Sequence, residues 1–148
     1  MQANDIMSPN PACCSPDSTI REVARMMVEH DCGEIPVVDS ERKPIGVITD
    51  RDICCRVVAE GIDITRTQVR DHMTVPAFTV NMQDSVERCC DVMESHMIRR
   101  VPVVDAFGKC VGIVSQADLA QKADSYNVSH LVREVSVPSE HAARKVLG

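Results

Sequence analysis

Residues 46–52 read GVITDRD, and residues 112–118 read GIVSQAD. Each segment runs glycine, two apolar residues, a hydroxyl residue, two further residues and an aspartate. Each also follows a Pro-Val-Val-Asp run, at residues 36–39 and 102–105, by the same distance. Thr or Ser followed by Asp is an ordinary start of a helix, so one copy would carry little information. Two copies in register indicate a duplicated structural unit.

The duplication extends beyond these segments. An offset of 66 positions aligns residues 5–53 with residues 71–119 without a gap, and 11 of the 49 pairs are identical. A unit of about 50 residues is only marginally stable alone, so the two repeats are expected to share one core. We predict a first repeat at 5–61, a linker at 62–70, a second repeat at 71–123 and a C-terminal helical tail at 124–148.

Each repeat is expected to form a helix, two strands and a second helix, after a short extended segment at 12–14 or 78–80. In the first repeat, Thr19 and Glu22 have the spacing of a capping box ahead of an apolar helical face. Short β-branched runs at 35–38 and 45–49, joined by a polar turn, predict a hairpin of buried strands. The predicted fold class is therefore α/β (α+β), with two pseudo-symmetric β-α-β-β-α units.

The second helix of repeat 1 is predicted over residues 50–60. Ile53, Val57 and Val58 fall on one face of it, and Gly61 is expected to end it. In the tail, Val128, Leu131, Val132 and Val135 recur at helical spacing, and a break at residues 137–139 precedes a short amphipathic stretch at 140–147. The tail is expected to pack onto the body of the protein or to form a dimer contact or docking surface.

Composition excludes several classes of protein. The net charge is -6, and the chain has one Tyr, two Phe and no Trp. A nucleic-acid surface needs many cations and, for exposed bases, aromatic platforms, so no nucleic-acid partner is expected. The first 20 residues have neither a basic start nor an apolar run, and no stretch is long and apolar enough to cross a bilayer. We therefore expect a cytoplasmic protein with no membrane association.

The eight cysteines are expected to be free thiols, because their spacing lacks the form of a zinc site and the cytosol is reducing. The offset places five of them opposite apolar residues, which predicts burial in the core; these are Cys14, Cys32, Cys54, Cys89 and Cys90. Cys13 and Cys55 align with Thr79 and Gln121 and are expected to be more exposed. A thiol-based redox or metal regulator is the less favoured alternative, and no metal site is predicted.

The repeated motif carries the chemistry. Thr49 and Ser115 lie where a strand passes into a helix, so backbone N–H groups at the helix start favour an anion and the hydroxyl adds a donor. Asp52 and Asp118 follow one helical turn later, where a carboxylate can accept hydrogen bonds from ribose hydroxyls. The glycine lets the backbone approach closely. The pattern suits a ribose phosphate.

The paired motifs, with D-x-M-[ST] opening each repeat, resemble the tandem CBS (cystathionine β-synthase type) pair, or Bateman module, over residues 5–123. The resemblance implies repeats packed through their sheets, with two clefts that bind AMP, ADP, ATP or related adenosyl ligands. It implies that Asp52 and Asp118 hold the ribose and that Thr49 and Ser115 lie near ribose or phosphate. The base pockets it implies are formed by Ile35, Pro36, Val101, Pro102, Cys13, Cys14, Thr79 and Val80.

The two repeats differ in charge ahead of the proline. Where the second has Arg99 and Arg100, the first has Gly33 and Glu34. The resemblance implies phosphate contacts at this position, so phosphate recognition is predicted to be one-sided. A solvated surface pair is the alternative for the two arginines, and Arg51 is equally compatible with a phosphate ligand or an exposed helix residue.

No catalytic constellation is present: the chain lacks a nucleophile elbow, a G-x-x-x-x-G-K-[ST] loop and a G-x-G-x-x-G turn. We therefore predict a non-catalytic sensor, with an adenine nucleotide as regulatory ligand and no catalytic cofactor. The resemblance adds a homodimer and a regulated protein partner of unknown identity. A ligand-free interaction or dimerisation module is the main alternative.

Overall fold

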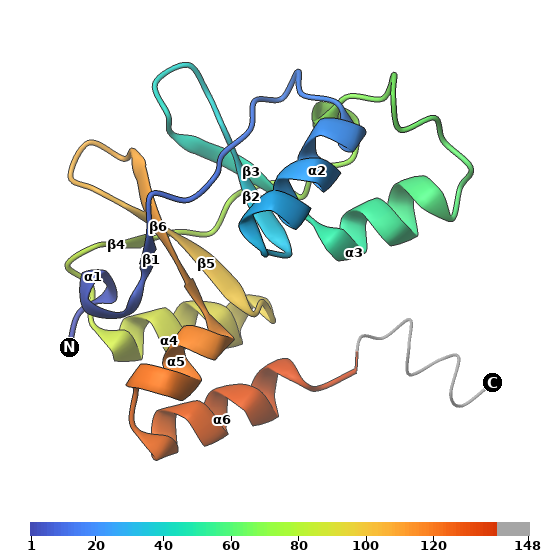
Figure 1. Ribbon diagram of the computed structural model, residues 1–148. Helices are drawn as coiled ribbons and strands as arrows, with labels where there is room; N and C mark the ends of the chain where they lie inside the picture. The colour runs from blue at the N-terminus through green and yellow to red at the C-terminus, as the bar shows by residue number, and fades with distance from the viewer. Residues whose placement is uncertain (139–148) are drawn as a thin grey trace.

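The computed structural model describes residues 1–138, so the predicted stretch at 140–147 lies outside the described residues. Its elements are α1 Ala3–Ile6, β1 Ser8–Pro9, α2 Ile20–His30, β2 Glu34–Val38, β3 Pro44–Thr49, α3 Asp50–Asp52, the π-helix η1 Ile53–Val58, the 3₁₀-helix η2 Val69–Asp71, β4 Val80–Asn81, α4 Val86–His96, β5 Arg100–Val104, β6 Cys110–Ser115, α5 Gln116–Lys122 and α6 Ser125–Val135. Figure 1 shows the two repeats side by side, each with a hairpin and helices, which confirms the predicted mixed fold.

The two hairpins follow from the apolar runs and correspond residue by residue at the predicted offset. In repeat 1, β2 pairs antiparallel with β3, with Ile35 opposite Ile48. In repeat 2, β5 pairs antiparallel with β6, with Val101 opposite Val114. All four of these side chains are fully buried. Each hairpin therefore contributes the centre of one hydrophobic core.

The opening segments of the repeats are exchanged. Strand β1, from the start of repeat 1, pairs antiparallel with β6 of repeat 2, with Ser8 opposite Ile113. Thr74, at the start of repeat 2, forms the corresponding antiparallel bridge to Val47 of repeat 1. Ile6 is fully buried in the core of repeat 2, and Val69 is fully buried in the core of repeat 1. Each repeat thus needs the other's opening segment to complete its structure.

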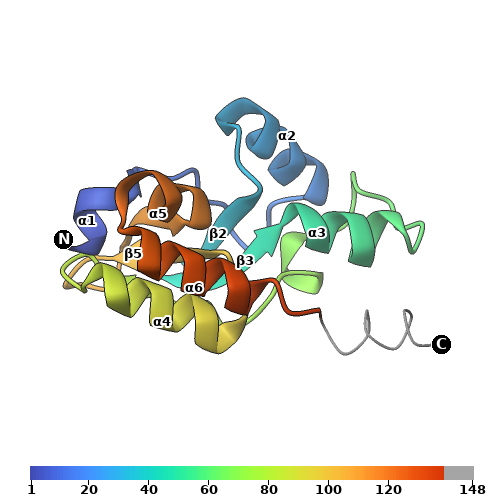
Figure 2. The same ribbon diagram turned by 90° about the horizontal axis from the view of Figure 1, so that it is seen from below.

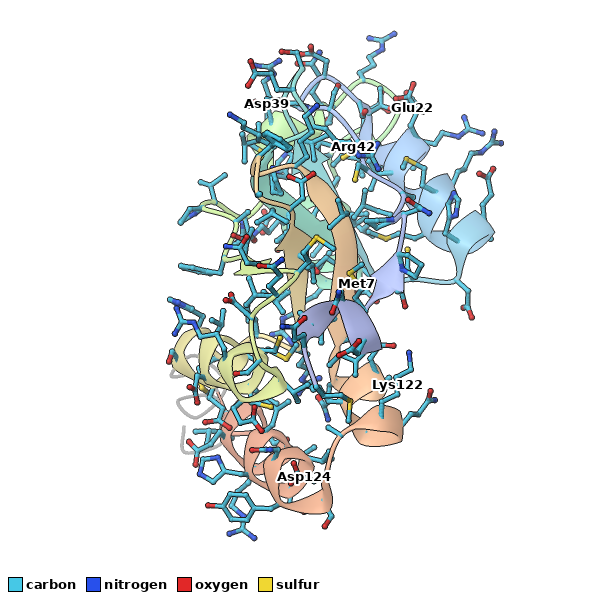
Figure 3. The ribbon with its side chains drawn as sticks, turned by 90° about the vertical axis from the view of Figure 1, so that its left-hand side faces the viewer. Met7, Glu22, Asp39, Arg42, Lys122 and Asp124 are labelled. Carbon is cyan, nitrogen blue, oxygen red and sulfur yellow. The ribbon has the colours of Figure 1, made fainter. Side chains whose placement is uncertain are left out.

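The motif glycines make this exchange possible. A Cβ atom on Gly112 would lie 2.9 Å from Cγ of Met7, and a Cβ on Gly46 would lie 2.8 Å from the carbonyl oxygen of Thr74. Met7 belongs to the N-terminal segment, between α1 and β1, and lies near the middle of the molecule (Figure 3). The close approach predicted for these glycines is therefore made to the exchanged segment of the same chain.

The predicted helix at 50–60 is only partly correct, because residues 53–58 form a π-helix. Ala59 N–H bonds to the carbonyl of Cys54 at 3.0 Å, five residues back, and this wider turn changes which side chains share a face. Val57 is fully buried, but Val58 is 59% exposed, so its predicted place on the apolar face is wrong. Gly61 ends the segment at a φ of +68°.

The predicted burial of the cysteines is also only partly correct. Burial is confirmed for Cys14, Cys89 and Cys90, and Cys32 is half-buried. Burial of Cys54 is wrong: it is exposed, as is the equivalent Ala120, because this position of the repeat faces outward and an apolar partner at the offset does not imply a core position.

Helix α6 completes the core of repeat 2. Seen from below in Figure 2, it lies along α4 beside α5, and it contacts both helices. Leu131 is fully buried and Val135 is 6% exposed, whereas Val132 is turned outward. Asp124 caps the helix by accepting a hydrogen bond from Asn127 N–H at 3.0 Å. No helix among residues 1–138 is long and apolar enough to cross a membrane.

We predict that Leu131→Ala lowers the free energy of unfolding by about 2–4 kcal/mol, since it leaves a cavity in the core of repeat 2, where α6 packs against α4 and α5. Val132→Ala, one residue on and 36% exposed, is the matched control and should cost less than about 1 kcal/mol. Urea unfolding followed by circular dichroism measures both. Equal effects of the two changes would contradict the packing of α6 into this core.

Candidate functional site

A cleft of about 660 Å³ lies where the two repeats meet. We call it the Asp118 cleft. Repeat 2 supplies the end of β6 and the start of α5, with Ser115 and Asp118, and the residues that begin β5, Arg99 and Arg100. The lining residues of repeat 1 come from β1, the segment after it, the end of α2 and the start of β2; they are Ser8, Pro9, Asn10, Pro11, Ala12, His30, Asp31, Cys32 and Glu34.

Asp118 is fixed at the first turn of α5 by Ser115. Its Oδ2 atom accepts hydrogen bonds from Ser115 N–H and Ser115 Oγ, each at 2.9 Å, and its own N–H donates to Ser115 Oγ at 3.1 Å. Within residues 1–138, Oδ1 accepts no hydrogen bond, and the side chain is only half-buried. The carboxylate therefore keeps an oriented oxygen at the cleft that can accept from a ligand hydroxyl.

Asp52, the equivalent residue of repeat 1, has a different environment. Its Oδ2 accepts from Thr49 N–H at 3.1 Å, and Thr74 Oγ1 donates within 3.2 Å of Oδ2 and 3.3 Å of Oδ1. Arg56 Nε lies 3.6 Å from Oδ1. The side chain is buried, and it does not line the Asp118 cleft. Both carboxylate oxygens of Asp52 are thus already engaged by other side chains of the protein.

The two arginines occupy different positions. Arg99 is exposed at the mouth of the cleft, whereas Arg100 is half-buried and extends toward repeat 1. A Cβ atom on Gly33 would lie 2.7 Å from Nη2 of Arg100 and 2.8 Å from Oδ2 of Asp50, so the guanidinium lies over the Gly33 backbone near a carboxylate. Arg99 is therefore the cation of this pair that is more available to an incoming anion.

Glu34 is a cleft residue that the sequence interpretation did not assign. It is 6% exposed, and its Oε2 atom has no hydrogen-bond partner among the described residues. The pKa of Glu34 is raised to about 7, chiefly by burial; the charge of Arg100 opposes this increase, and the neighbouring carboxylates of Asp52 and Asp50 add to it. The sequence did contain one signal that could have identified Glu34 as a cleft residue: the 66-residue offset aligns it with Arg100, for which a phosphate contact was predicted.

The other predicted site residues lie elsewhere. None of the eight predicted base-pocket residues is among those that line the Asp118 cleft. Six of them are buried, namely Ile35, Pro36, Val101, Pro102, Cys14 and Val80, whereas Cys13 and Thr79 are half-buried. Thr49 and the exposed Arg51 also lie outside the cleft lining. Their roles in ligand binding stay predictions.

The described residues offer no evident metal centre: within 1–138, no group of three or more His, Cys, Asp or Glu side chains is placed to hold a metal ion. The lining of the Asp118 cleft offers a carboxylate, a hydroxyl and two guanidinium groups, which suit recognition of a polar ligand.

The repeated geometry matches a known family. The family model of the CBS domain matches twice, at residues 3–58 and 69–124. The chain belongs to the CBS domain family. Both matches begin at the exchanged opening segments and end after the helices that carry Asp52 and Asp118. Each repeat as described therefore corresponds to one CBS domain.

Relatives of this CBS pair include small proteins. Hypoxic response protein 1 of Mycobacterium tuberculosis is 31% identical over 136 residues, covering 92% of this chain and 94% of that protein. A crystal structure of a hypoxic response protein I with two coordinated zinc ions has a TM-score of 0.76 at 32% identity, over 84% of this chain and 100% of that one. The chain spans 61% of the length of another relative, an uncharacterized protein of Methanopyrus kandleri.

Two solved CBS structures contain adenosyl ligands. The CBS domain protein PAE2072 of Pyrobaculum aerophilum, complexed with AMP, has a TM-score of 0.77 at 27% identity and covers 90% of this chain and 99% of its own. The CBS domain pair of protein MJ0100, in complex with 5′-methylthioadenosine and S-adenosyl-L-methionine, has a TM-score of 0.73 at 28% identity, over 82% and 94%.

The burial of Glu34 predicts a pH-dependent stability. Because its pKa is raised from 4.5 to about 7 on folding, the folded state binds more protons, and the free energy of unfolding should fall as the pH rises through this window. Glu34→Gln removes this titration, so relative to the wild type it should gain about 1–3 kcal/mol of stability between about pH 5 and about pH 8.

Urea unfolding at the two pH values measures this gain. Glu41→Gln is the matched control, because the Glu41 side chain is 67% exposed and should show no such gain. A difference between Glu34→Gln and the wild type that is the same at both pH values would rule out titration of Glu34 in this window.

Proposed function

We propose that this CBS pair is a non-catalytic regulatory module that binds an adenine nucleotide or related adenosyl ligand in the Asp118 cleft. The observation that carries the proposal is the open Oδ1 of Asp118, which Ser115 holds at a helix start in the same cleft that the two arginines line. A carboxylate suits a ribose diol, and a guanidinium suits a phosphate. The AMP, S-adenosyl-L-methionine and 5′-methylthioadenosine complexes of relatives support this ligand class.

The regulatory part of the proposal follows from the composition of the cleft. Its lining comes from both repeats, so a bound ligand would contact β1 and the end of α2 from repeat 1 and α5 from repeat 2. A ligand that binds only this arrangement stabilises it by RT ln(1 + [L]/Kd), where [L] is the free ligand concentration and Kd its dissociation constant. A partner protein, or a second copy in a homodimer, would then respond to the occupied form.

We place one ligand per chain in this proposal. The Asp52 carboxylate is engaged by Thr74 and Arg56, and Glu34 stands where repeat 2 has an arginine. The engaged Asp52 and the presence of Glu34 also favour a second candidate function for repeat 1: it has kept the CBS fold but binds no ligand, and it serves as an interaction or dimerisation surface. The two candidates differ in whether mutation of the Asp118 cleft changes ligand affinity.

Asp118→Asn is predicted to weaken binding of the preferred nucleotide by about 10- to 100-fold, because an amide keeps an oxygen for the Ser115 cap but replaces a charged acceptor at the ribose. Isothermal calorimetry with AMP, ADP, ATP and S-adenosyl-L-methionine measures the affinity. Asp52→Asn is the matched control and should leave the affinity within about twofold of wild type. Absence of binding by the wild type, or equal affinity of Asp118→Asn, would overturn the proposal.

The arginines are tested by their dependence on phosphate. Arg99→Met should reduce the affinity for ATP by about tenfold while leaving adenosine nearly unchanged, because it removes the cation and keeps an unbranched apolar stem. Arg100→Met should have the smaller effect, since Arg100 already lies beside Asp50 and Glu34. Arg51→Met, outside the cleft, is the control. Parallel losses for ATP and adenosine would argue against phosphate contact at Arg99.

A further inference from the structure

Charged groups of both signs line the Asp118 cleft. The guanidinium groups are those of Arg99 and Arg100, and the carboxyl groups are those of Asp31, Glu34 and Asp118. A cleft that concentrates polyphosphates needs an excess of positive charge along its walls. Here the carboxyl groups outnumber the guanidinium groups, so the charge of a ligand is itself a criterion for binding.

Glu34 differs from the other two carboxyl groups in its surroundings. Asp31 is exposed to solvent, and Asp118 is half-buried with its Oδ2 atom bonded to Ser115. The Glu34 side chain is 6% exposed, and within residues 1–138 its Oε2 atom has no hydrogen-bond partner. A buried charge is screened by water and salt much less than an exposed one. Of the three carboxyl groups, Glu34 therefore acts most strongly on an anion in the cleft.

The backbone fixes Glu34 at the boundary between the two repeats. It is the first residue of β2 and pairs with Thr49, the last residue of β3. Directly before it, the carbonyl of Gly33 accepts a hydrogen bond at 2.9 Å from the N–H of Asp50, the first residue of α3. Because the strand pair and the helix start hold this point of the chain together, moving the backbone of Glu34 away from the cleft would break the hairpin.

Arg100 is poorly placed to offset the charge of Glu34 for a ligand, because carboxyl groups already lie near its guanidinium. A Cβ atom on Gly33 would meet Nη2 of Arg100 at 2.7 Å and Oδ2 of Asp50 at 2.8 Å, so these two groups share the space over one backbone position. The positive charge of Arg100 also acts on Glu34. Arg99, which is exposed, is thus the guanidinium of the lining that remains available to a phosphate.

We propose that Glu34 is a specificity-determining residue of the Asp118 cleft, whose buried carboxylate makes the cleft prefer an adenosyl ligand with at most one phosphate group over ADP and ATP. This preference rests on the proposed function, because it concerns the ligand of the same cleft. One guanidinium, that of Arg99, can neutralise one phosphate, whereas each further phosphate adds negative charge to a cleft that Glu34 lines. An adenosyl ligand that carries a sulfonium in place of a phosphate avoids this repulsion.

The charge of Glu34 depends on pH. Burial is the main cause that raises its pKa to about 7; the charge of Arg100 opposes the increase, and Asp52 and Asp50 add to it. Below this pH the carboxyl group is neutral, so the preference against polyphosphates should weaken as the pH falls from about 8 to about 6. The other ionisable groups of the lining are His30, Asp31, Cys32, Arg99 and Asp118. Glu34→Gln retains all of them, so its comparison with the wild type isolates the effect of Glu34.

Isothermal calorimetry of the full-length chain at about pH 8 tests this preference with adenosine, AMP, ADP, ATP and S-adenosyl-L-methionine. The wild type should bind AMP or S-adenosyl-L-methionine about tenfold more tightly than ATP. Glu34→Gln keeps the shape of the side chain and removes its charge, so it should raise the affinity for ATP by about tenfold and leave that for adenosine within about twofold. A purely structural role of Glu34 would change the affinities for all ligands alike.

Two further variants serve as controls for the position of the charge. Asp31→Asn removes an exposed carboxylate from the same cleft, and Asn tolerates the left-handed backbone of this residue, at a φ of +48°. Because solvent screens Asp31, its removal should raise the affinity for ATP by less than about twofold. Glu41→Gln removes a charge outside the cleft, on a side chain that is 67% exposed, and should leave every affinity unchanged.

A double-mutant cycle examines the same charge through Arg100. Removal of the Glu34 charge leaves Arg100 with fewer carboxylates near it, so Arg100→Met should reduce the affinity for ATP more in the Glu34→Gln background than in the wild type. Equal reductions in the two backgrounds would show that Glu34 does not act on the phosphates. Circular dichroism establishes that each variant is folded.

The titrations separate the two levels of the assignment. If the wild type binds none of the five compounds, the proposed function fails, and the preference fails with it. If the wild type binds ATP as tightly as AMP, or if Glu34→Gln changes the affinities for ATP and adenosine by the same factor, the Asp118 cleft remains a nucleotide site and the role of Glu34 is refuted.

Discussion

The exchange of opening segments over the two motif glycines is the constraint on which the rest of the structure depends. Gly112 accepts Met7 against its backbone, and Gly46 accepts the backbone of residue Thr74. A side chain at either position would have to displace the segment that completes the neighbouring sheet. Because the crossing brings β1 of one repeat onto β6 of the other, it also sets the distance between the repeats and hence the cleft.

The internal symmetry of the molecule is close in backbone and broken in side chains. The hairpins and first helices correspond at a constant offset, yet Asp118 has an open carboxylate oxygen where Asp52 is enclosed by Thr74 and Arg56. Arg100 and Glu34 are equivalents that lie near each other across the interface. The two repeats thus share one backbone arrangement, but their potential ligand sites differ in charge, with Arg100 in one and Glu34 in the other, and in the accessibility of the motif aspartate.

The sequence was sufficient for the features that depend on local pattern. The β-branched runs predicted the hairpins, the spacing of Thr19 and Glu22 predicted the capping box, and the repeated motif predicted Ser115 and Asp118 at a helix start. The sequence could not predict features that depend on which repeat supplies a neighbour. The enclosure of Asp52 requires Thr74 from the exchanged segment, and the burial of Glu34 requires the facing repeat. The π-helix at 53–58 was missed because a pattern at 3.6 residues per turn assumes the α-helical hydrogen bond.

The exchange also determines the order in which the chain can fold during synthesis. Residues Ala3–Ile6 and Ser8–Pro9 leave the ribosome long before their partners in β6. The core of repeat 1 can form as soon as Val69 and Thr74 emerge, whereas the N-terminal segment must wait for the strands of repeat 2. Such long-range closure is slow relative to local contacts. In the nascent chain, the apolar side chains of Ala3 and Ile6 therefore remain uncovered while repeat 1 is already able to fold.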